Sequence, residues 1–121
     1  MTPIVDESSL RMLREVQEPG APDIVEETIA IFLTDAEQRL ALLRQAVAGA
    51  DALEVRRLAH AVRGSCLVLG VTRLAQACET LETMGATGRL ADAPEALALV
   101  TAEYAVARDT LRQIAARGEA A

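Results

Sequence analysis

The chain has 121 residues, which is enough for one domain with a hydrophobic core that needs neither a disulfide nor a metal ion. Its residues are 51% apolar, yet tryptophan is absent and phenylalanine and tyrosine occur once each, a mixture that favours helix over strand. The net charge of -6 argues against a nucleic-acid binder, which usually presents a basic face, and no apolar stretch reaches the roughly 18 to 20 residues of a membrane span.

A short first helix is predicted over residues 6–16. Leu10, Leu13 and Val16 fall on one side of it at helical spacing and should face inward. The Glu-Pro-Gly turn at 18–20 should end this segment, because proline and glycine interrupt helices. We therefore expect a lid over one end of the remaining helices.

A second and longer helix is predicted from about Pro22 to Ala48. Its apolar residues recur at steps of three and four, which is the spacing of a buried helix face. This stripe comprises Val25, Ile29, Phe32, Ala36, Leu40, Leu43 and Val47. A stripe of this length has to be covered by other helices.

The third and fourth helices follow with almost no linker between them. Asp51 is predicted to cap the third helix, with Glu54 in the capping-box position, and Gly70 is predicted to end it. The fourth helix is predicted from residue 71 or 72 to about residue 84, and the Gly-Ala-Thr-Gly run at 85–88 should end it. Its inner face is formed by Val71, Leu74, Cys78 and Leu81.

A fifth helix is predicted to begin after Asp92, with Pro94 in its first turn and Glu95 in the capping-box position. Its core positions step by three and four in the manner of a helix-bundle seam. They are Leu97, Val100, Tyr104, Ala107, Leu111 and Ile114. The tail at 117–121 is expected to fray.

Short connections between long amphipathic helices favour antiparallel neighbours. We therefore predict an all-α fold, an up-down-up-down antiparallel four-helix bundle with a short additional N-terminal helix. The four-helix core should span about residues 22–117. Because the sequence has no internal repeat, no low-complexity segment and no domain boundary, residues 1–121 are predicted to form a single domain.

The N-terminus, MTPIVDESSL, lacks the basic start and the apolar run of a signal peptide, and we expect a cytoplasmic protein. Cys66 and Cys78 lie among apolar neighbours at helical spacing and should be buried free thiols. One histidine and two separated cysteines make a poor ligand set, so we predict no metal site.

The segment LAHAVRGSCLVLG, residues 58–70, contains the only histidine, His60. On a helical wheel at about 100° per residue, a core face lies opposite this histidine. That face comprises Val55, Leu58, Val62, Ser65, Cys66 and Leu69. His60 should therefore point to solvent. The residues within about 60° of it form an outward face of Leu53, Arg56, Arg57, Arg63, Gly64 and Leu67.

Gly64 stands one turn after His60 on the outward face, where a glycine costs a helix about 1 kcal/mol relative to alanine. The compensating property that we infer is access, since a residue without a side chain lets another molecule approach the imidazole. Arg63 adds a fixed positive charge suited to an anion attached to His60. An exposed imidazole is a competent nucleophile toward phosphorus near neutral pH. Together these residues fit a phosphorylated histidine.

This segment resembles the signature of histidine-containing phosphotransfer (HPt) domains of two-component phosphorelays. In that signature an Ala-His pair is followed by an apolar residue, Lys-Gly-Ser, a small residue and Leu-Gly. The matching residues here are Ala59-His60, Val62, Arg63-Gly64-Ser65, Cys66 and Leu69-Gly70, and the likeness continues through Phe32-Leu33, Leu43, Leu74, Cys78, Leu81-Glu82 and Glu103-Tyr104. The one departure is Arg63 in place of lysine, in a chain that has no lysine. Arginine keeps the charge but carries it on a planar fork.

The resemblance implies that His60 accepts a phosphoryl group from a receiver-domain aspartate and passes it to the aspartate of a response regulator. In that family the domain is a carrier without catalytic apparatus or cofactor of its own, and the receiver supplies Mg²⁺. Arg63 would then be the charge beside the phosphate, and Gly64 would leave room for the receiver. The resemblance also implies that the fourth helix borders the site, which brings Glu82 near it.

Receiver domains of response regulators and hybrid histidine kinases are the predicted partners. The candidate contact residues are Leu53, Arg56, Arg57, Ser65, Leu67 and Glu82. Ser65 lies near the core edge, and its hydroxyl should also bond back to the helix backbone. We predict no nucleic-acid or membrane partner, and we expect a monomer.

Two alternatives stay open. One is an HPt-like interaction module that binds a receiver or a kinase without carrying phosphate. The other is the phosphoacceptor domain of a larger histidine kinase, although the initial methionine and the self-contained ends favour a free-standing protein. No ATP-binding motif is present, so an autonomous kinase is not expected.

Overall fold

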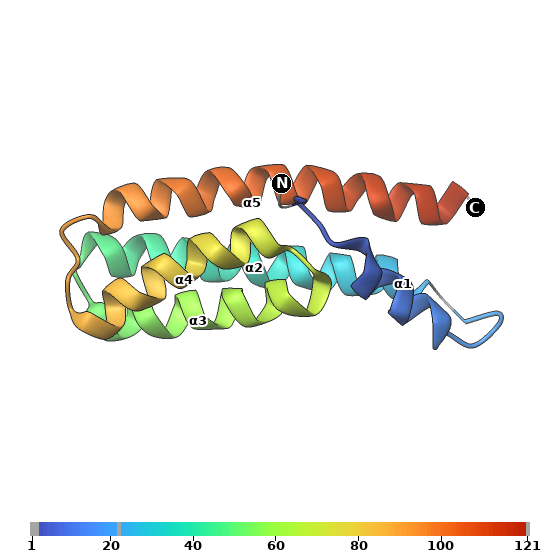
Figure 1. The fold of residues 1–121 in the computed structure, drawn as a ribbon, viewed down its shortest axis with the longest axis horizontal. Helices are drawn as coiled ribbons and strands as arrows, with labels where there is room; N and C mark the ends of the chain where they lie inside the picture. Colours follow the sequence, from blue (N-terminus) through green and yellow to red (C-terminus); the bar gives the residue numbers. More distant parts are fainter. Residues whose placement is uncertain (1–2, 22, 121) are drawn as a thin grey trace.

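The computed structural model describes residues 3–21 and 23–120, and within these ranges it contains helices and no strand. The helices are α1 (Glu7–Glu15), α2 (Ile24–Ala48), α3 (Ala52–Leu69), α4 (Thr72–Thr87) and α5 (Ala93–Ala120). The four long helices lie side by side, and consecutive ones are joined at alternate ends of the bundle (Figure 1). The predicted all-α class is confirmed. None of the described helices is long and apolar enough to cross a membrane.

The core lies between the four long helices, because α2 packs against α3 and α5, and α4 packs against the same two helices. Every predicted core position of α2 and α5 is buried or packs against the core, with Val47 and Leu97 only partly buried. The single tyrosine is also buried, and its hydroxyl donates to Glu37 Oε2 at 2.8 Å. Among the described residues no other polar or charged side chain is buried. The apolar periodicity therefore identified the core faces of α2 and α5.

The ends of α3 follow the predicted signals in part. The Asp51 carboxylate accepts the Glu54 backbone N–H at 3.2 Å, which is the predicted N-cap. The Glu54 side chain does not complete a capping box, since both of its oxygens accept hydrogen bonds from Arg57 at 2.8 Å. Gly70 ends the helix at a φ of 73°, and a Cβ atom there would collide with the backbone of Asp6. Only glycine fits this position without strain.

The run at 85–88 ends α4 as predicted, but only at its last residue, three residues after the predicted helix end. The helix continues past Met84 to Thr87 and ends at Gly88, which has a φ of 72°. Gly85 lies inside the helix and is buried, and a Cβ atom on it would lie 2.7 Å from the Ala52 carbonyl oxygen. This glycine is present because α4 approaches the backbone of α3 closely. It does not stop the helix.

Two other helix boundaries also differ from the prediction. Helix α2 begins at Ile24 after the cap Asp23, and the predicted start at Pro22 lies outside the described residues. The tail that was expected to fray is helical as far as Ala120, while residue 121 lies outside the described part. The last turns thus continue the regular geometry of α5.

Helix α1 lies at the end of the bundle where α2 begins, as Figure 1 shows. Leu10 is buried and Leu13 is partly buried, as predicted. The inward orientation predicted for Val16 was wrong, because α1 ends at Glu15 and Val16 follows it with 73% of its surface exposed. Val16 keeps helical backbone angles, and on the wheel it lies about 120° from the buried Leu10, outside the buried side of α1.

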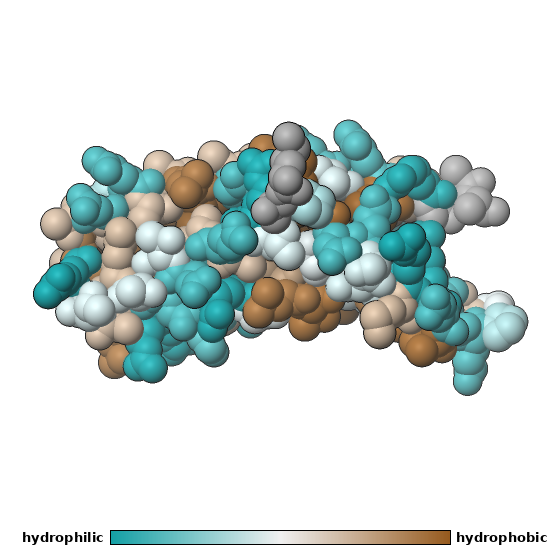
Figure 2. Space-filling view, viewed as in Figure 1, coloured by the Kyte–Doolittle hydropathy of each residue, from teal (hydrophilic) through white to brown (hydrophobic). Residues whose placement is uncertain are grey.

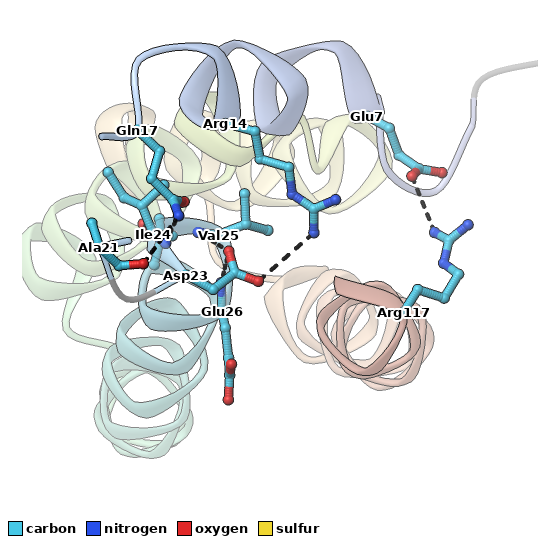
Figure 3. A network of polar contacts seen from close by, with 10 residues as sticks. Glu7, Arg14, Gln17, Ala21, Asp23, Ile24, Val25, Glu26 and Arg117 are labelled. Carbon is cyan, nitrogen blue, oxygen red and sulfur yellow. Dashed lines mark hydrogen bonds and ion pairs between the residues drawn. The ribbon is translucent and has the colours of Figure 1, made fainter. Parts of the chain in front are cut away.

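Polar contacts attach α1 to the other helices (Figure 3). Arg14 lies 3.9 Å from the Asp23 carboxylate at the start of α2, and Arg117 of α5 donates to Glu7 at 3.0 Å. Gln17 accepts the Ile24 backbone N–H at 3.0 Å. These contacts hold the lid to both α2 and α5.

Candidate functional site

Helix α3 has the two faces that the helical wheel predicted. Its core face is buried at Val55, Leu58, Val62, Cys66 and Leu69, while Ser65 is only half-buried. His60 lies on the opposite side, and 66% of its side chain is exposed. The imidazole is therefore accessible to another macromolecule.

Glu82 of α4 connects the histidine to the arginine three residues after it. His60 Nδ1 lies 3.2 Å from Glu82 Oε2, and Arg63 Nε donates to Glu82 Oε1 at 2.9 Å. A carboxylate only accepts, so the hydrogen bond to His60 requires a proton on Nδ1. In the neutral imidazole this leaves the lone pair on Nε2, the nitrogen suited to nucleophilic attack.

The close packing of α4 on α3 places Glu82 within reach of His60. Gly85 lies one turn after Glu82 on α4, and it lies against the backbone of Arg56 on α3. Arg56 comes one turn before His60, and the two helices are antiparallel, so Glu82 lies beside His60. A Cβ atom on Gly85 would lie 2.5 Å from the Arg56 backbone nitrogen. The absent side chain at 85 thus sets the helix spacing that allows a glutamate to bridge two residues of α3.

Helix packing does not require a glycine at position 64. It is exposed within α3, and a Cβ atom built on it would meet no atom of the described residues within 4 Å. Its backbone is helical, a conformation that any residue but proline adopts readily. The fold would therefore accept a side chain at this position, in contrast to Gly70 and Gly85.

An open groove of about 410 Å³ lies beside the histidine. Its lining residues are Leu53, Glu54, Arg56, Arg57, His60 and Glu82. Arg57 is paired with Glu54, and its hydrogen bonds lower the pKa of the Glu54 carboxyl. Arg56 is exposed and forms no ion pair within the described part of the chain. Four of the six predicted contact residues thus meet at one side of His60.

Comparison with known proteins identifies the family. The Hpt domain model matches residues 27–116, which is most of the chain and includes the whole site. The chain belongs to the Hpt domain family. The membership that the motif of α3 predicted is confirmed.

Solved structures agree with this assignment. Histidine-containing phosphotransfer protein B (HptB) from Pseudomonas aeruginosa PAO1 is 31% identical and superposes with a TM-score of 0.87, over 97% of this chain and 98% of that one. Histidine-containing phosphotransfer protein ZmHP2 from maize is 25% identical, with a TM-score of 0.80 over 96% of this chain and 89% of that chain. These neighbours confirm the helical-bundle fold of an HPt domain.

A curated relative is similar over a shorter range. Multistep phosphorelay regulator 1 of Schizosaccharomyces pombe is 26% identical over 82 residues, which is 68% of this chain. The chain spans only 28% of the length of that protein. The similarity therefore extends to one part of a larger relative.

On the other side of His60, this HPt domain exposes an apolar surface. Leu67 is 56% exposed, the exposed Val68 follows it on α3, and Val68 lines a shallow pocket together with the exposed Ile31 of α2. Figure 2 shows apolar side chains gathered over the C-terminal half of α3. Sequence reasoning missed Val68 and Ile31, since Val68 lies about 80° from His60 on the wheel, outside the 60° sector. Ile31 could have been found as an apolar residue of α2 that lies outside the predicted core stripe.

The structure places Ser65 away from the groove, between α3 and α2. Its hydroxyl donates to the Ala61 carbonyl oxygen at 3.2 Å, which confirms the predicted bond back to the helix. It also accepts a hydrogen bond from Arg39 Nη1 of α2 at 3.4 Å. These contacts give Ser65 a part in the packing of α3 on α2.

Two thiols lie beneath the site. Cys66 and Cys78 are buried and free, as predicted. Burial raises the pKa of both thiols, that of Cys78 to about 12, so they stay protonated near neutral pH. Within the described residues no three histidine, cysteine, aspartate or glutamate side chains form a group that could hold a metal ion.

Proposed function

We propose that this HPt domain is a phosphorelay carrier that receives a phosphoryl group on His60 Nε2 from a phosphoaspartate and passes it to another receiver-domain aspartate. The arrangement around the single histidine supports this function. The imidazole is exposed, its Nδ1 is held by Glu82, and the neighbouring glycine leaves space for a partner.

In the accepting step the Nε2 lone pair forms a bond to phosphorus. The bond between phosphorus and the aspartate oxygen breaks, and its electron pair leaves with the carboxylate. The onward step reverses these changes at a second receiver. The chain supplies the nucleophile and carries the group, while the receiver supplies Mg²⁺ and most of the charge stabilisation.

Arg63 supports the transfer through its charge. One guanidinium N–H is used by Glu82, and the remaining donors are suited to the oxygens of a phosphoryl group on His60. A guanidinium presents these donors in a fixed plane, which a lysine ammonium cannot do. Arginine is therefore compatible with the carrier role.

The proposed partners are receiver domains, which carry acidic residues around their phosphorylated aspartate. Arg56 offers a positive charge that is not neutralised by a described neighbour, at the edge of the groove beside His60. Leu53 on one side and Leu67 on the other side offer apolar contacts. Gly64 lies between Leu67 and the histidine, so a receiver seated on Leu67 could approach Nε2 without obstruction.

The test is transfer from phosphorylated receivers of the source organism to the purified protein. Wild-type protein should acquire acid-labile, base-stable phosphate, and His60→Gln should acquire none. Because the chain has one histidine, any phosphohistidine identifies His60 directly. Equal labelling of the wild type and the variant, or no labelling by any receiver, would overturn the proposal.

The same experiment separates the two alternatives. A receiver that binds wild-type and His60→Gln protein equally, without transfer, would support an interaction module. Label that arrives from a histidine kinase and ATP in the absence of any receiver would support the phosphoacceptor domain of a kinase.

A further inference from the structure

We propose that Arg56 selects among receivers by pairing with a carboxylate that the docked receiver places in the groove beside His60. This inference rests on the carrier function proposed above. It goes further because it assigns the choice of partner to one residue of this chain. The receivers that Arg56 favours carry an exposed aspartate or glutamate next to an apolar side chain.

Of the two arginines that line the groove, Arg56 is the one free to bind a partner. Arg57 is held by Glu54, whose two oxygens each accept a hydrogen bond from it at 2.8 Å. Arg56 is exposed, and no carboxylate of the described residues pairs with it. The other acid of the groove, Glu82, is engaged on both oxygens by other side chains. The positive charge that the groove offers to a partner is therefore that of Arg56.

The direction of the side chain places this charge outside the phosphoryl site. In an α-helix the bond from Cα to Cβ tilts toward the helix N-terminus. Arg56 comes one turn before His60, so its side chain starts out pointing away from the imidazole. Arg63 comes almost one turn after His60, so its side chain starts out pointing toward the imidazole. Arg63 is thus placed to contact the phosphoryl group, and Arg56 is placed to contact the surface of the partner.

An apolar residue continues the groove away from the histidine. Leu53 lies seven residues before His60 on nearly the same line along α3, and 70% of its surface is exposed. At 1.5 Å per residue, Arg56 lies about 6 Å and Leu53 about 10 Å from His60 along the helix axis. A small domain is about 30 Å across, so a receiver whose aspartate meets Nε2 also covers both residues. The groove therefore suits an acidic side chain with an apolar neighbour.

The charge of the whole chain gives a single cation at this position more influence. The net charge is -6, so most of the surface repels an acidic partner. A charge at the rim of an interface raises the rate of association with a partner of opposite charge and disfavours a partner of like charge. A receiver that places lysine or arginine opposite Arg56 should therefore be rejected. The expected effect is on the encounter with the receiver, while the chemistry at Nε2 stays the same.

The first test compares Arg56→Gln with Arg57→Gln, which removes the same unit of charge from the next position. Transfer from the phosphorylated receiver that labels the wild type fastest is followed by quenched flow at low salt. Arg56→Gln should slow this transfer about fivefold to tenfold. Arg57→Gln and the charge-conserving Arg56→Lys should stay within about twofold of the wild type. Loss of long-range attraction alone would slow both glutamine variants equally.

A small phosphoryl donor separates partner choice from chemistry. Phosphoramidate transfers its phosphoryl group to imidazole and releases ammonia, and phosphohistidine is followed by ³¹P NMR. It should label Arg56→Gln at the rate of the wild type, because it does not extend into the groove. Salt provides a second readout that a structural role would not change. The difference between the wild type and Arg56→Gln should shrink at about 1 M salt, where the Debye length is only about 3 Å.

Charge exchange identifies the partner carboxylate. Arg56→Glu should transfer more slowly than Arg56→Gln, because it repels the acidic side chain of the receiver. Exposed acidic residues of the receiver are then replaced by lysine one at a time. One of these receiver variants should restore transfer to Arg56→Glu while it transfers more slowly to the wild type.

Equal transfer to the wild type and Arg56→Gln at low salt, or an equal slowing in Arg57→Gln, would overturn the inference. Failure of every receiver variant to rescue Arg56→Glu would also overturn it. A wild-type dimer that Arg56→Gln dissociates in sedimentation experiments would instead assign the groove to a second copy of the chain. Thermal unfolding should confirm that the variants are folded, since the substituted side chain is exposed. If no receiver labels the wild type, the carrier function fails as well, whereas labelling that is insensitive to position 56 overturns this inference alone.

Discussion

Substitutions of Gly64 should affect stability and phosphotransfer in opposite directions. The fold leaves space for a side chain here, since a Cβ atom would meet no described atom within 4 Å. Alanine in the exposed interior of a helix is about 0.8–1 kcal/mol more favourable than glycine. Gly64→Ala should therefore raise the free energy of unfolding by about 1 kcal/mol, which corresponds to roughly 3–5 °C in Tm for a chain of this size. Differential scanning calorimetry would measure the change.

Gly64→Gln tests the function of the same position. Glutamine is a good helix former, so the variant should be at least as stable as the wild type. Its side chain would project from the turn after His60 into the space through which a receiver approaches. We expect transfer from a phosphorylated receiver to fall at least tenfold, while labelling by the much smaller phosphoramidate should change less than threefold.

Two results would refute this reasoning. A loss of stability in Gly64→Ala would mean that the fold requires the glycine. Undiminished transfer from receivers to Gly64→Gln would mean that the glycine does not provide access. Stopped-flow or quenched-flow transfer at matched receiver concentrations gives the second comparison directly.

Four further predictions concern the packing, the buried thiols and the outer surface. Gly85→Ala should lower the free energy of unfolding by about 1–3 kcal/mol, because the added Cβ would press on the α3 backbone, and chemical denaturation would measure this loss. Cys66 and Cys78 should resist DTNB at pH 8 until the chain unfolds. Since burial raises both pKa values, stability should fall as the pH rises above 9, by up to about 1.4 kcal/mol per pH unit for each thiol, and urea titrations between pH 8 and 11 would detect the slope. Leu67→Ala should weaken receiver binding in calorimetric titrations but leave phosphoramidate labelling unchanged; unaltered affinity would exclude Leu67 from the interface.

The buried thiols should make the free energy of unfolding fall, not rise, at alkaline pH. A thiol of the unfolded chain ionises near pH 9, while the buried thiol keeps its proton to higher pH, to about 12 for Cys78. Below pH 9 both states are protonated and the thiols cause no pH dependence. Above it the unfolded state alone releases protons and is favoured. Stability that stayed constant or increased from pH 9 to pH 11 would contradict the burial of these side chains.

The features that the sequence predicted well are those determined within one helix. The core stripe of α2, the cap at Asp51 and the outward direction of His60 depend on spacing along a single segment. Apolar periodicity and capping chemistry report such features, because the same residues that form the helix also determine which face is buried.

The features that the sequence missed depend on distances between helices. Gly85 is indistinguishable from a helix-ending glycine until α4 is seen against α3. The carboxylate of Glu82 bonds to His60 and Arg63, which come 22 and 19 positions earlier in the sequence, and no local pattern encodes these contacts. Only the family resemblance suggested that Glu82 is near the site, and it did not indicate which groups it bonds. Val16 was misjudged because it follows the last residue of α1 and lies about 120° from Leu10 on the wheel, too far round to reach the core.

The central claim is that His60 carries phosphate between receivers, and two-step transfer tests it most directly. One phosphorylated receiver is mixed with this HPt domain, and after removal of that receiver a second, unphosphorylated one is added. The account predicts that phosphate appears on His60 and then on the second receiver, with nothing transferred through His60→Gln. Phosphate that reaches the second receiver equally well through the variant, or that never appears on the wild type, would contradict it.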